Sequence, residues 1–226
     1  MRLTARWNGA RELPRRLEYR CNQVHQFAES HTASSSKPDV CVVADMSPPA
    51  SGELDLNRLR NGTPGITPDF GGCLCEAASV CLEDRSHTSG VSISVDGALA
   101  AHTMPLVWPA ATQQAKHCYA DPQFAVEFGA YGIAVLLIER LTEFTVVERS
   151  RKGTGFDYWL GPKRDAQPLF QDKRKLEVSG VLDGDENDVR RRLRQKLDQL
   201  RRGGVPLPGY GIVVCFAAPE ARVGAP

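Results

Sequence analysis

Three acidic residues lie in segments whose other residues are mainly apolar: Glu127, Asp157 and Glu177. A carboxylate among apolar neighbours is costly unless it is paired, protonated or bound to a cation. Three carboxylates that converged on one point would need a divalent cation, and Mg²⁺ prefers carboxylate and water oxygens. Such a cation can generate hydroxide from water and stabilise the transition state of phosphodiester cleavage. The alternative interpretation is that Asp157 and Glu177 are salt-bridged to nearby arginines.

The elements that must position these acids are predicted from the spacing of apolar residues. A helix is expected over residues 122–141, because proline suits the first turn of a helix. Strands are expected at residues 144–147, 156–160, 175–181 and 210–217. Asp185 begins a further helix, which carries an apolar stripe. The order is α-β-β-β-α-β, with Asp157 in the second strand and Glu177 in the third.

The first 120 residues are predicted to form an N-terminal α+β extension. A helix is expected at residues 73–82, and Asp96-Gly97 predicts a hairpin between strands 91–95 and 98–107. Residues 121–226 are then a separate core domain. The predicted fold class is α/β with a mixed sheet.

Two short motifs within that order resemble the PD-(D/E)XK nuclease superfamily. They are Gly155-Phe156-Asp157 in the second strand and Leu176-Glu177-Val178-Ser179 in the third. The resemblance covers roughly residues 122–218 and implies a restriction-endonuclease-like core. It departs from the family pattern at Ser179, where the family has its lysine.

The resemblance implies a role for each acidic residue. Asp157 and Glu177 would hold Mg²⁺ or Mn²⁺, and Glu127 would complete the site or orient a water. Lys175 lies two residues before Glu177, so both side chains share one face of the strand. Lys175 is therefore expected to stabilise charge on the attacked phosphate in place of the missing lysine.

Basic residues are concentrated around these acids. Residues 148–202 contain 15 Lys and Arg against 10 Asp and Glu, whereas the whole chain has a net charge of +1. A polyanionic partner is therefore expected beside the acids, with DNA favoured over RNA. The residues expected to contact nucleic acid are Arg149, Arg151, Lys152, Lys173, Arg174, Arg191 and Arg194. Trp159 is a further residue that could stack on a base.

Composition narrows the class of protein. Hydrophobic residues make up 42% of the 226 residues and charged residues 24%, as in globular proteins. The longest strongly apolar window, residues 128–138, is too short to span a bilayer, so no membrane partner is expected. Seven cysteines without regular spacing, and no recognisable secretory signal, indicate a reduced, cytoplasmic protein.

The predicted function is metal-dependent hydrolysis of phosphodiester bonds in DNA. By analogy of fold, such a nuclease would serve bacterial restriction, repair or phage defence. The alternative is a catalytically degenerate relative that binds nucleic acid or serves as an assembly subunit, and Ser179 supports that hypothesis. A homo-oligomer or a larger complex is compatible with either.

Overall fold

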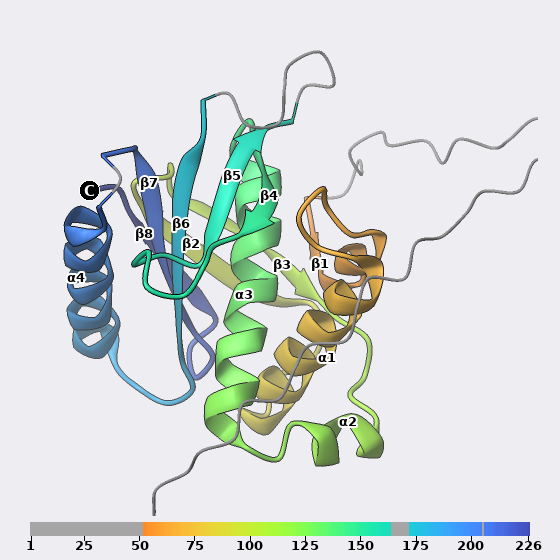
Figure 1. The fold of residues 1–226 in the computed structure, drawn as a ribbon. Helices are drawn as coiled ribbons and strands as arrows, with labels where there is room; N and C mark the ends of the chain where they lie inside the picture. The colour runs from red at the N-terminus through yellow and green to blue at the C-terminus, as the bar shows by residue number, and fades with distance from the viewer. Residues whose placement is uncertain (1–51, 164–171, 205) are drawn as a thin grey trace, which may run out of the picture. The chain divides into compact units, whose positions relative to one another are not determined.

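The computed structural model describes residues 52–163, 172–204 and 206–226. The chain divides into two compact units, Met1–Met46 and Ser47–Pro226, and the first lies outside the described residues. The second is built on one eight-stranded mixed sheet with the strand order β1-β3-β2-β8-β7-β6-β5-β4 (Figure 1). This unit runs across residue 120, where the sequence predicts a domain boundary, because β2 pairs in parallel with β8 near the C-terminus.

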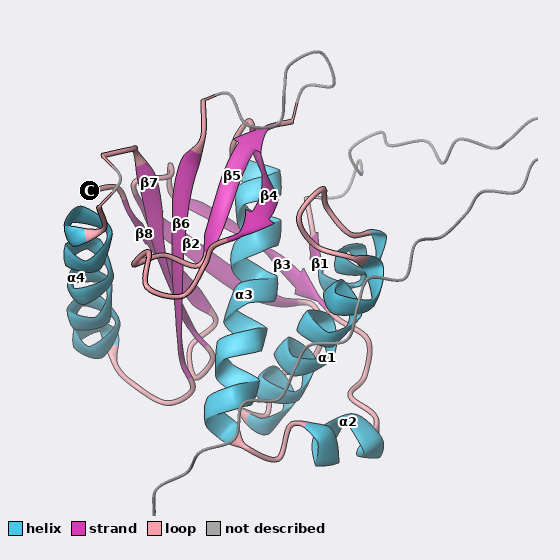
Figure 2. Cartoon of the chain, viewed as in Figure 1, coloured by secondary structure: helices cyan, strands magenta, loops and turns pink. Residues whose placement is uncertain are grey.

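Figure 2 distinguishes the strands from the helices of the described residues. The strands are β1 (Leu54–Asp55), β2 (Val91–Gly97), β3 (His102–Val107), β4 (Phe144–Arg149), β5 (Tyr158–Pro162), β6 (Arg174–Val181), β7 (Gly209–Cys215) and β8 (Glu220–Gly224). The helices are the 3-10 helix η1 (Leu56–Asn61), α1 (Pro68–Asp84), α2 (Gln113–Cys118), α3 (Pro122–Leu141) and α4 (Glu186–Arg202).

Helix α3 is the central helix of the core. Its residues 129–138 are all buried, and it packs against α1 and β6. The close approach of α3 to α1 depends on a glycine, since a Cβ at Gly129 would lie 3.0 Å from the Cα of Ala78. Although α3 is strongly apolar, no helix of the described residues is both long and apolar enough to cross a bilayer.

The sheet is curled. A short segment that follows β1 and η1, at one end of the strand order, is therefore hydrogen-bonded to β4 at the other end. The amide of Gly65 donates to the carbonyl of Val146 over 2.9 Å, and the hydroxyl of Thr63 donates to the same carbonyl over 2.9 Å. These contacts cover part of the edge of β4, which would otherwise be open to pairing with another chain.

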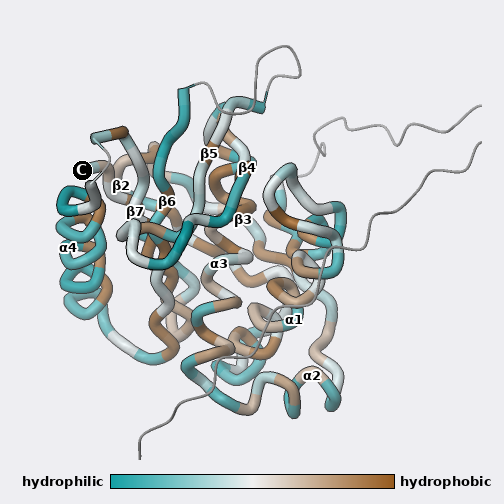
Figure 3. Tube along the Cα trace, in the orientation of Figure 1, coloured by the Kyte–Doolittle hydropathy of each residue, from teal (hydrophilic) through white to brown (hydrophobic). Residues whose placement is uncertain are grey.

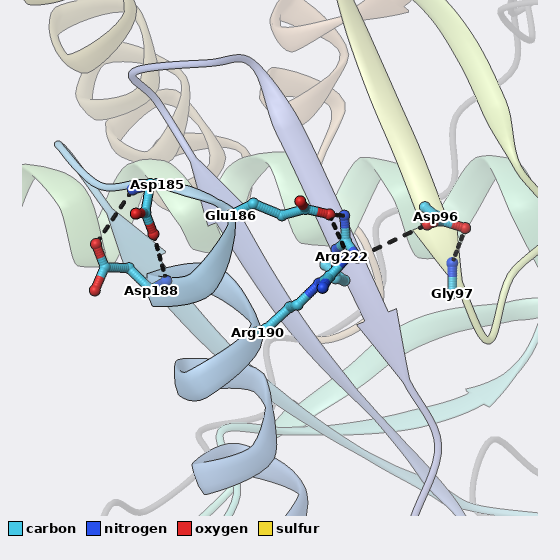
Figure 4. Close-up of polar contacts among 7 residues, drawn as sticks. All are labelled: Asp96, Gly97, Asp185, Glu186, Asp188, Arg190 and Arg222. Atoms are coloured by element: carbon cyan, nitrogen blue, oxygen red, sulfur yellow. Dashed lines mark hydrogen bonds and ion pairs between the residues drawn. The ribbon is translucent and has the colours of Figure 1, made fainter.

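Helix α4 covers the face of the sheet opposite to α3. It is hydrophilic outside with a narrow apolar stripe, as Figure 3 shows. Its first turn is fixed by a capping box, in which Asp185 and Asp188 each accept a hydrogen bond from the backbone amide of the other (Figure 4). Arg222 on β8 contacts Glu186 over 3.1 Å and Asp96 on β2 over 3.9 Å. Arg222 therefore ties the start of α4 to two neighbouring strands.

The structure confirms the α/β class and the mixed sheet. Helix α3 has the bounds predicted for residues 122–141. The prediction that Asp157 lies in the second strand is wrong, because β5 begins at Tyr158. The turn before β5 includes Gly153 and Gly155, which adopt φ of +95° and +83°. Asp157 is the last residue before the strand begins.

Candidate active site

The second half of β6 has an edge that β5 does not cover. β5 pairs with β6 only between Leu160↔Arg174 and Tyr158↔Leu176, whereas β7 follows β6 as far as Val181. This uncovered edge borders a cleft of about 820 Å³ between α3 and α4. The polar side chains that line the cleft include Glu127, Tyr131, Asp157, Glu177, Ser179, Asp183, Arg192, Lys196 and Gln199.

Asp157 is held at the end of the cleft where β5 begins. Its amide donates to the carbonyl of Leu176, so its backbone is fixed against β6. Its Oδ2 accepts a hydrogen bond over 2.8 Å from the amide of Val178, two residues beyond the last residue of β6 that pairs with β5. Its Oδ1 lies 3.0 Å from the hydroxyl of Tyr131 on α3. The carboxylate thus links α3 to the uncovered edge of β6.

Glu177 lies beside Asp157 and is only 1% exposed. Its Oε1 accepts a hydrogen bond from Nζ of Lys196 over 2.5 Å, and its Oε2 has no partner among the described residues. Burial, and to a smaller extent the neighbouring Asp157, raise the pKa of the Glu177 carboxyl to about 7 against the opposing effect of Lys196. Shifts of this kind cluster at functional sites and also occur in structural ion-pair networks.

The lysine that approaches Glu177 comes from α4. Lys175, which the sequence predicts for this role, is buried away from the cleft lining. Its Nζ donates to the carbonyl of Leu200 over 2.8 Å, and burial lowers its pKa. Lys175 and Glu177 do share a face of β6, but successive residues on that face meet successive turns of α4. Lys175 therefore meets the helix end, whereas Glu177 meets Lys196.

Glu127 is an exposed residue on the cleft wall formed by α3. Its Oε1 lies 2.9 Å from the hydroxyl of Tyr131, one turn further along the helix. Glu127 therefore reaches Asp157 through Tyr131. The structure brings three of the four predicted catalytic residues, Glu127, Asp157 and Glu177, to one cleft and places Lys175 outside its lining.

The predicted nucleic-acid-binding residues lie on several elements of the fold. The guanidinium of Arg149 lies 5.6 Å from the ring centres of both Tyr131 and Tyr158, so this residue is beside the site. Arg151 and Lys152 are exposed in the turn that leads to Asp157.

The remaining four lie elsewhere. Lys173 covers the ring of Trp159 at 4.8 Å, and Arg174 lies over Phe144 at 4.4 Å. Arg191 is paired with Asp188 over 2.6 Å. Arg191 and Arg194 project from the side of α4 away from the cleft, since residues 192, 196 and 199 form the cleft side.

Asp157 and Glu177 are the two residues of the cleft that could hold a divalent cation. Among the described residues, no group of three or more His, Cys, Asp and Glu side chains is arranged to hold a metal. Mg²⁺ commonly binds to one or two carboxylates and completes its coordination with waters and substrate phosphates. Asp157 and Glu177 supply such a pair, and Oε2 of Glu177 is a buried oxygen to which no described residue donates a hydrogen bond.

Sequence reasoning missed Lys196, Arg192 and Tyr131. A signal for Lys196 was present, because it lies in the apolar stripe of α4 at helical spacing from Val189 and Leu200. A lysine in such a stripe faces the sheet and needs an acidic partner there. Tyr131 is four residues after Glu127 and therefore shares its helix face. Arg192 carried no separate signal within the run Arg190-Arg191-Arg192.

No family model matches the chain, and comparisons with curated proteins and with solved structures find no match either. The functional conclusion therefore depends on the geometry of the cleft.

Proposed function

We propose that the protein is a divalent-cation-dependent nuclease of the PD-(D/E)XK type that hydrolyses phosphodiester bonds in DNA. The observation that carries the proposal is the convergence of Asp157 and Glu177 in one cleft with Lys196. Two carboxylates and one ammonium, set at an uncovered strand edge, combine cation ligands with a group that can bind a phosphate oxygen.

The charge of the cleft supports the need for a cation. Its lining includes four acidic side chains, Glu127, Asp157, Glu177 and Asp183, and two basic ones, Arg192 and Lys196. A phosphodiester carries a further negative charge, so the cleft by itself would repel the substrate. A divalent cation held by Asp157 and Glu177 would reverse this repulsion and would supply a nucleophilic hydroxide and Lewis acidity.

The other side chains have roles that follow from their positions. Lys196 would turn from Glu177 to the substrate phosphate, because a cation at Glu177 would repel the ammonium group. Once there, it would stabilise the negative charge that develops in the transition state. Arg192 lies on the same side of α4 and would hold a neighbouring phosphate.

One observation favours the alternative of a degenerate nuclease that binds without cleaving. The Lys196–Glu177 pair already neutralises a proposed cation ligand, and the two side chains are only 22% and 2% exposed. A cation that could not displace Lys196 would leave the cleft inert. The protein would then act through binding to nucleic acid or within an assembly.

Cleavage of plasmid DNA, single-stranded DNA and RNA with Mg²⁺ or Mn²⁺ tests the proposal. The variants are Asp157→Asn and Glu177→Gln, which remove charge but keep shape. The control is Asp183→Asn, which makes the same change at a carboxylate that is 81% exposed at the margin of the cleft. We expect cation-dependent cleavage of DNA that both variants lose and the control keeps.

Absence of cleavage with either cation, together with salt-sensitive binding of DNA, would contradict the enzyme and favour the degenerate binder. Preferential cleavage of RNA would keep the chemistry but overturn the substrate.

A further inference from the structure

The hydroxyl of Tyr131 lies between two carboxylates. Its oxygen is 2.9 Å from Oε1 of Glu127 and 3.0 Å from Oδ1 of Asp157. A phenol carries a single proton, so it can donate to only one of them at a time. Burial, together with the two carboxylate charges, raises the pKa of Tyr131, which keeps the hydroxyl protonated. The direction of its proton is therefore set by whichever carboxylate carries more negative charge.

Tyr131 and Val178 together hold both oxygens of Asp157. Tyr131 approaches Oδ1 from α3, and the amide of Val178 donates to Oδ2 from β6. The ring of Tyr131 is itself rigidly packed, because it is 4% exposed and meets Tyr158 edge-on with ring centres 5.4 Å apart. The orientation of Asp157 is thus fixed by two donors on elements that the core holds in place.

We propose that Tyr131 is the positioning residue for Asp157, and that Glu127 acts through Tyr131 without touching the cation. This inference rests on the proposed nuclease function. Without a cation, the hydroxyl is shared between the two carboxylates. A cation on Asp157 neutralises that carboxylate, so the O–H bond turns toward Glu127, and no proton leaves Tyr131. Glu127 therefore retains the hydroxyl in place while Asp157 binds the cation.

The first experiment needs no cation. Amide hydrogen exchange at Val178 is followed by NMR on the full chain in chelator, for wild type, Tyr131→Phe and Tyr158→Phe. Loss of one hydrogen bond to Asp157 is expected to speed exchange of the Val178 amide about five-fold in Tyr131→Phe. Tyr158→Phe is the matched control, because its buried hydroxyl has no partner among the described residues. Equal exchange in wild type and Tyr131→Phe would overturn the proposal.

The second experiment measures the binding of Mg²⁺ and of Mn²⁺ alone by titration calorimetry. Removal of a group that orients a metal ligand typically weakens affinity by about 10–100-fold, which is the loss expected for Tyr131→Phe. Glu127→Gln should weaken binding less, because an amide oxygen is a poorer acceptor than a carboxylate but still accepts from Tyr131. Tyr158→Phe should bind as wild type does.

The two measurements separate this inference from the proposed function. A wild type that binds neither cation would end the nuclease proposal, and Val178 exchange would then decide alone whether Tyr131 positions Asp157. Equal cation affinity of wild type and Tyr131→Phe would overturn the positioning role. If both proteins still cleaved DNA, the proposed nuclease function would stand. Thermal unfolding of each variant identifies any that have simply lost their fold.

Discussion

Lys196 on α4 and Glu177 on β6 form an ion pair of 2.5 Å at the wall of the cleft. The carboxylate is almost fully buried and the ammonium is partly exposed, so the lysine is the partner that can leave. A buried carboxylate that loses its partner is left with an uncompensated charge, unless a proton or a cation replaces that partner. The pair therefore couples the state of Glu177 to the position of Lys196.

Replacement of Lys196 by methionine should separate cation binding from catalysis. The variant lacks the charge that stabilises the phosphate, so we expect cleavage to fall about 100–1000-fold. Cation affinity should be unchanged or tighter, because no ammonium competes for Glu177. Cleavage rates and calorimetric titration measure the two effects. Lys116→Met is the control, since it removes a lysine from another ion pair, with Glu83 on α1. Lys196→Met with wild-type cleavage would contradict the role of Lys196.

The stability of the cation-free protein should fall as pH rises through the range in which Glu177 ionises. Its pKa is raised from 4.5 to about 7, chiefly by burial, so between these values the folded protein binds more protons than the unfolded chain. The unfolding free energy then decreases with pH, by on the order of 3 kcal/mol at most.

Urea denaturation of wild type and Glu177→Gln in chelator, from pH 5 to pH 8, measures this effect. The pKa values of Glu83 and Asp188 are lowered, so these groups act in the opposite sense, but equally in both proteins. We expect the unfolding free energy of Glu177→Gln to rise relative to that of wild type as the pH increases. A constant difference across the range would show that Glu177 titrates normally.

Arg192 should contribute more to DNA binding than its neighbour Arg191. Arg192 lines the cleft, whereas Arg191 is paired with Asp188 on the outer side of α4. Loss of one phosphate contact should weaken binding and reduce the slope of log K against log salt by about 1. Binding to DNA is measured over a salt series in the Asp157→Asn background, which prevents cleavage. An Arg191→Gln variant with the larger loss would place the DNA on the outer face of α4.

Gly180 is expected to tolerate no side chain. It lies on β6 where α3 crosses, and a Cβ there would overlap the Val126 side chain and lie 2.6 Å from the Val126 carbonyl. Gly180→Ala should therefore destabilise the protein by about 1–3 kcal/mol, measured by urea denaturation. Gly204→Ala is the matched control, because a Cβ at Gly204 meets nothing within 4 Å. Equal stability of the two variants would mean that α3 can move away from β6 at little cost.

The core elements could be predicted from local pattern, but their pairing could not. Helix α3 and strands β4 and β6 have strong apolar or β-branched signals, and the structure contains all three. The strand β8 was not predicted, although Glu220 and Arg222 alternate with apolar residues, because the segment is only five residues long. Its place between β2 and β7 depends on residues far apart in sequence. This long-range pairing is why the boundary predicted at residue 120 does not divide the sheet.

The candidate site was likewise predicted only in part. The element order and motifs of the resemblance predicted that Asp157 and Glu177 lie together, and both line the cleft. The lysine was predicted wrongly, because spacing along β6 favours Lys175 and the position of Lys196 in the apolar stripe of α4 does not by itself identify Glu177 as its partner. The contact of Tyr131 with Asp157 likewise requires knowing how closely α3 crosses the sheet.

The parallel pairing of β2 with β8 has a consequence for synthesis of the chain. Ser94 pairs with Glu220, so more than a hundred further residues must be synthesised before the β2–β3 hairpin can pair with β8. Because β8 lies between β2 and β7, a nascent chain that ends before it has no backbone pairing between the hairpin and the strands of the cleft. Until β8 is synthesised, the edge of β2 that β8 covers therefore has no partner strand among the described residues, and unpaired strand edges favour aggregation.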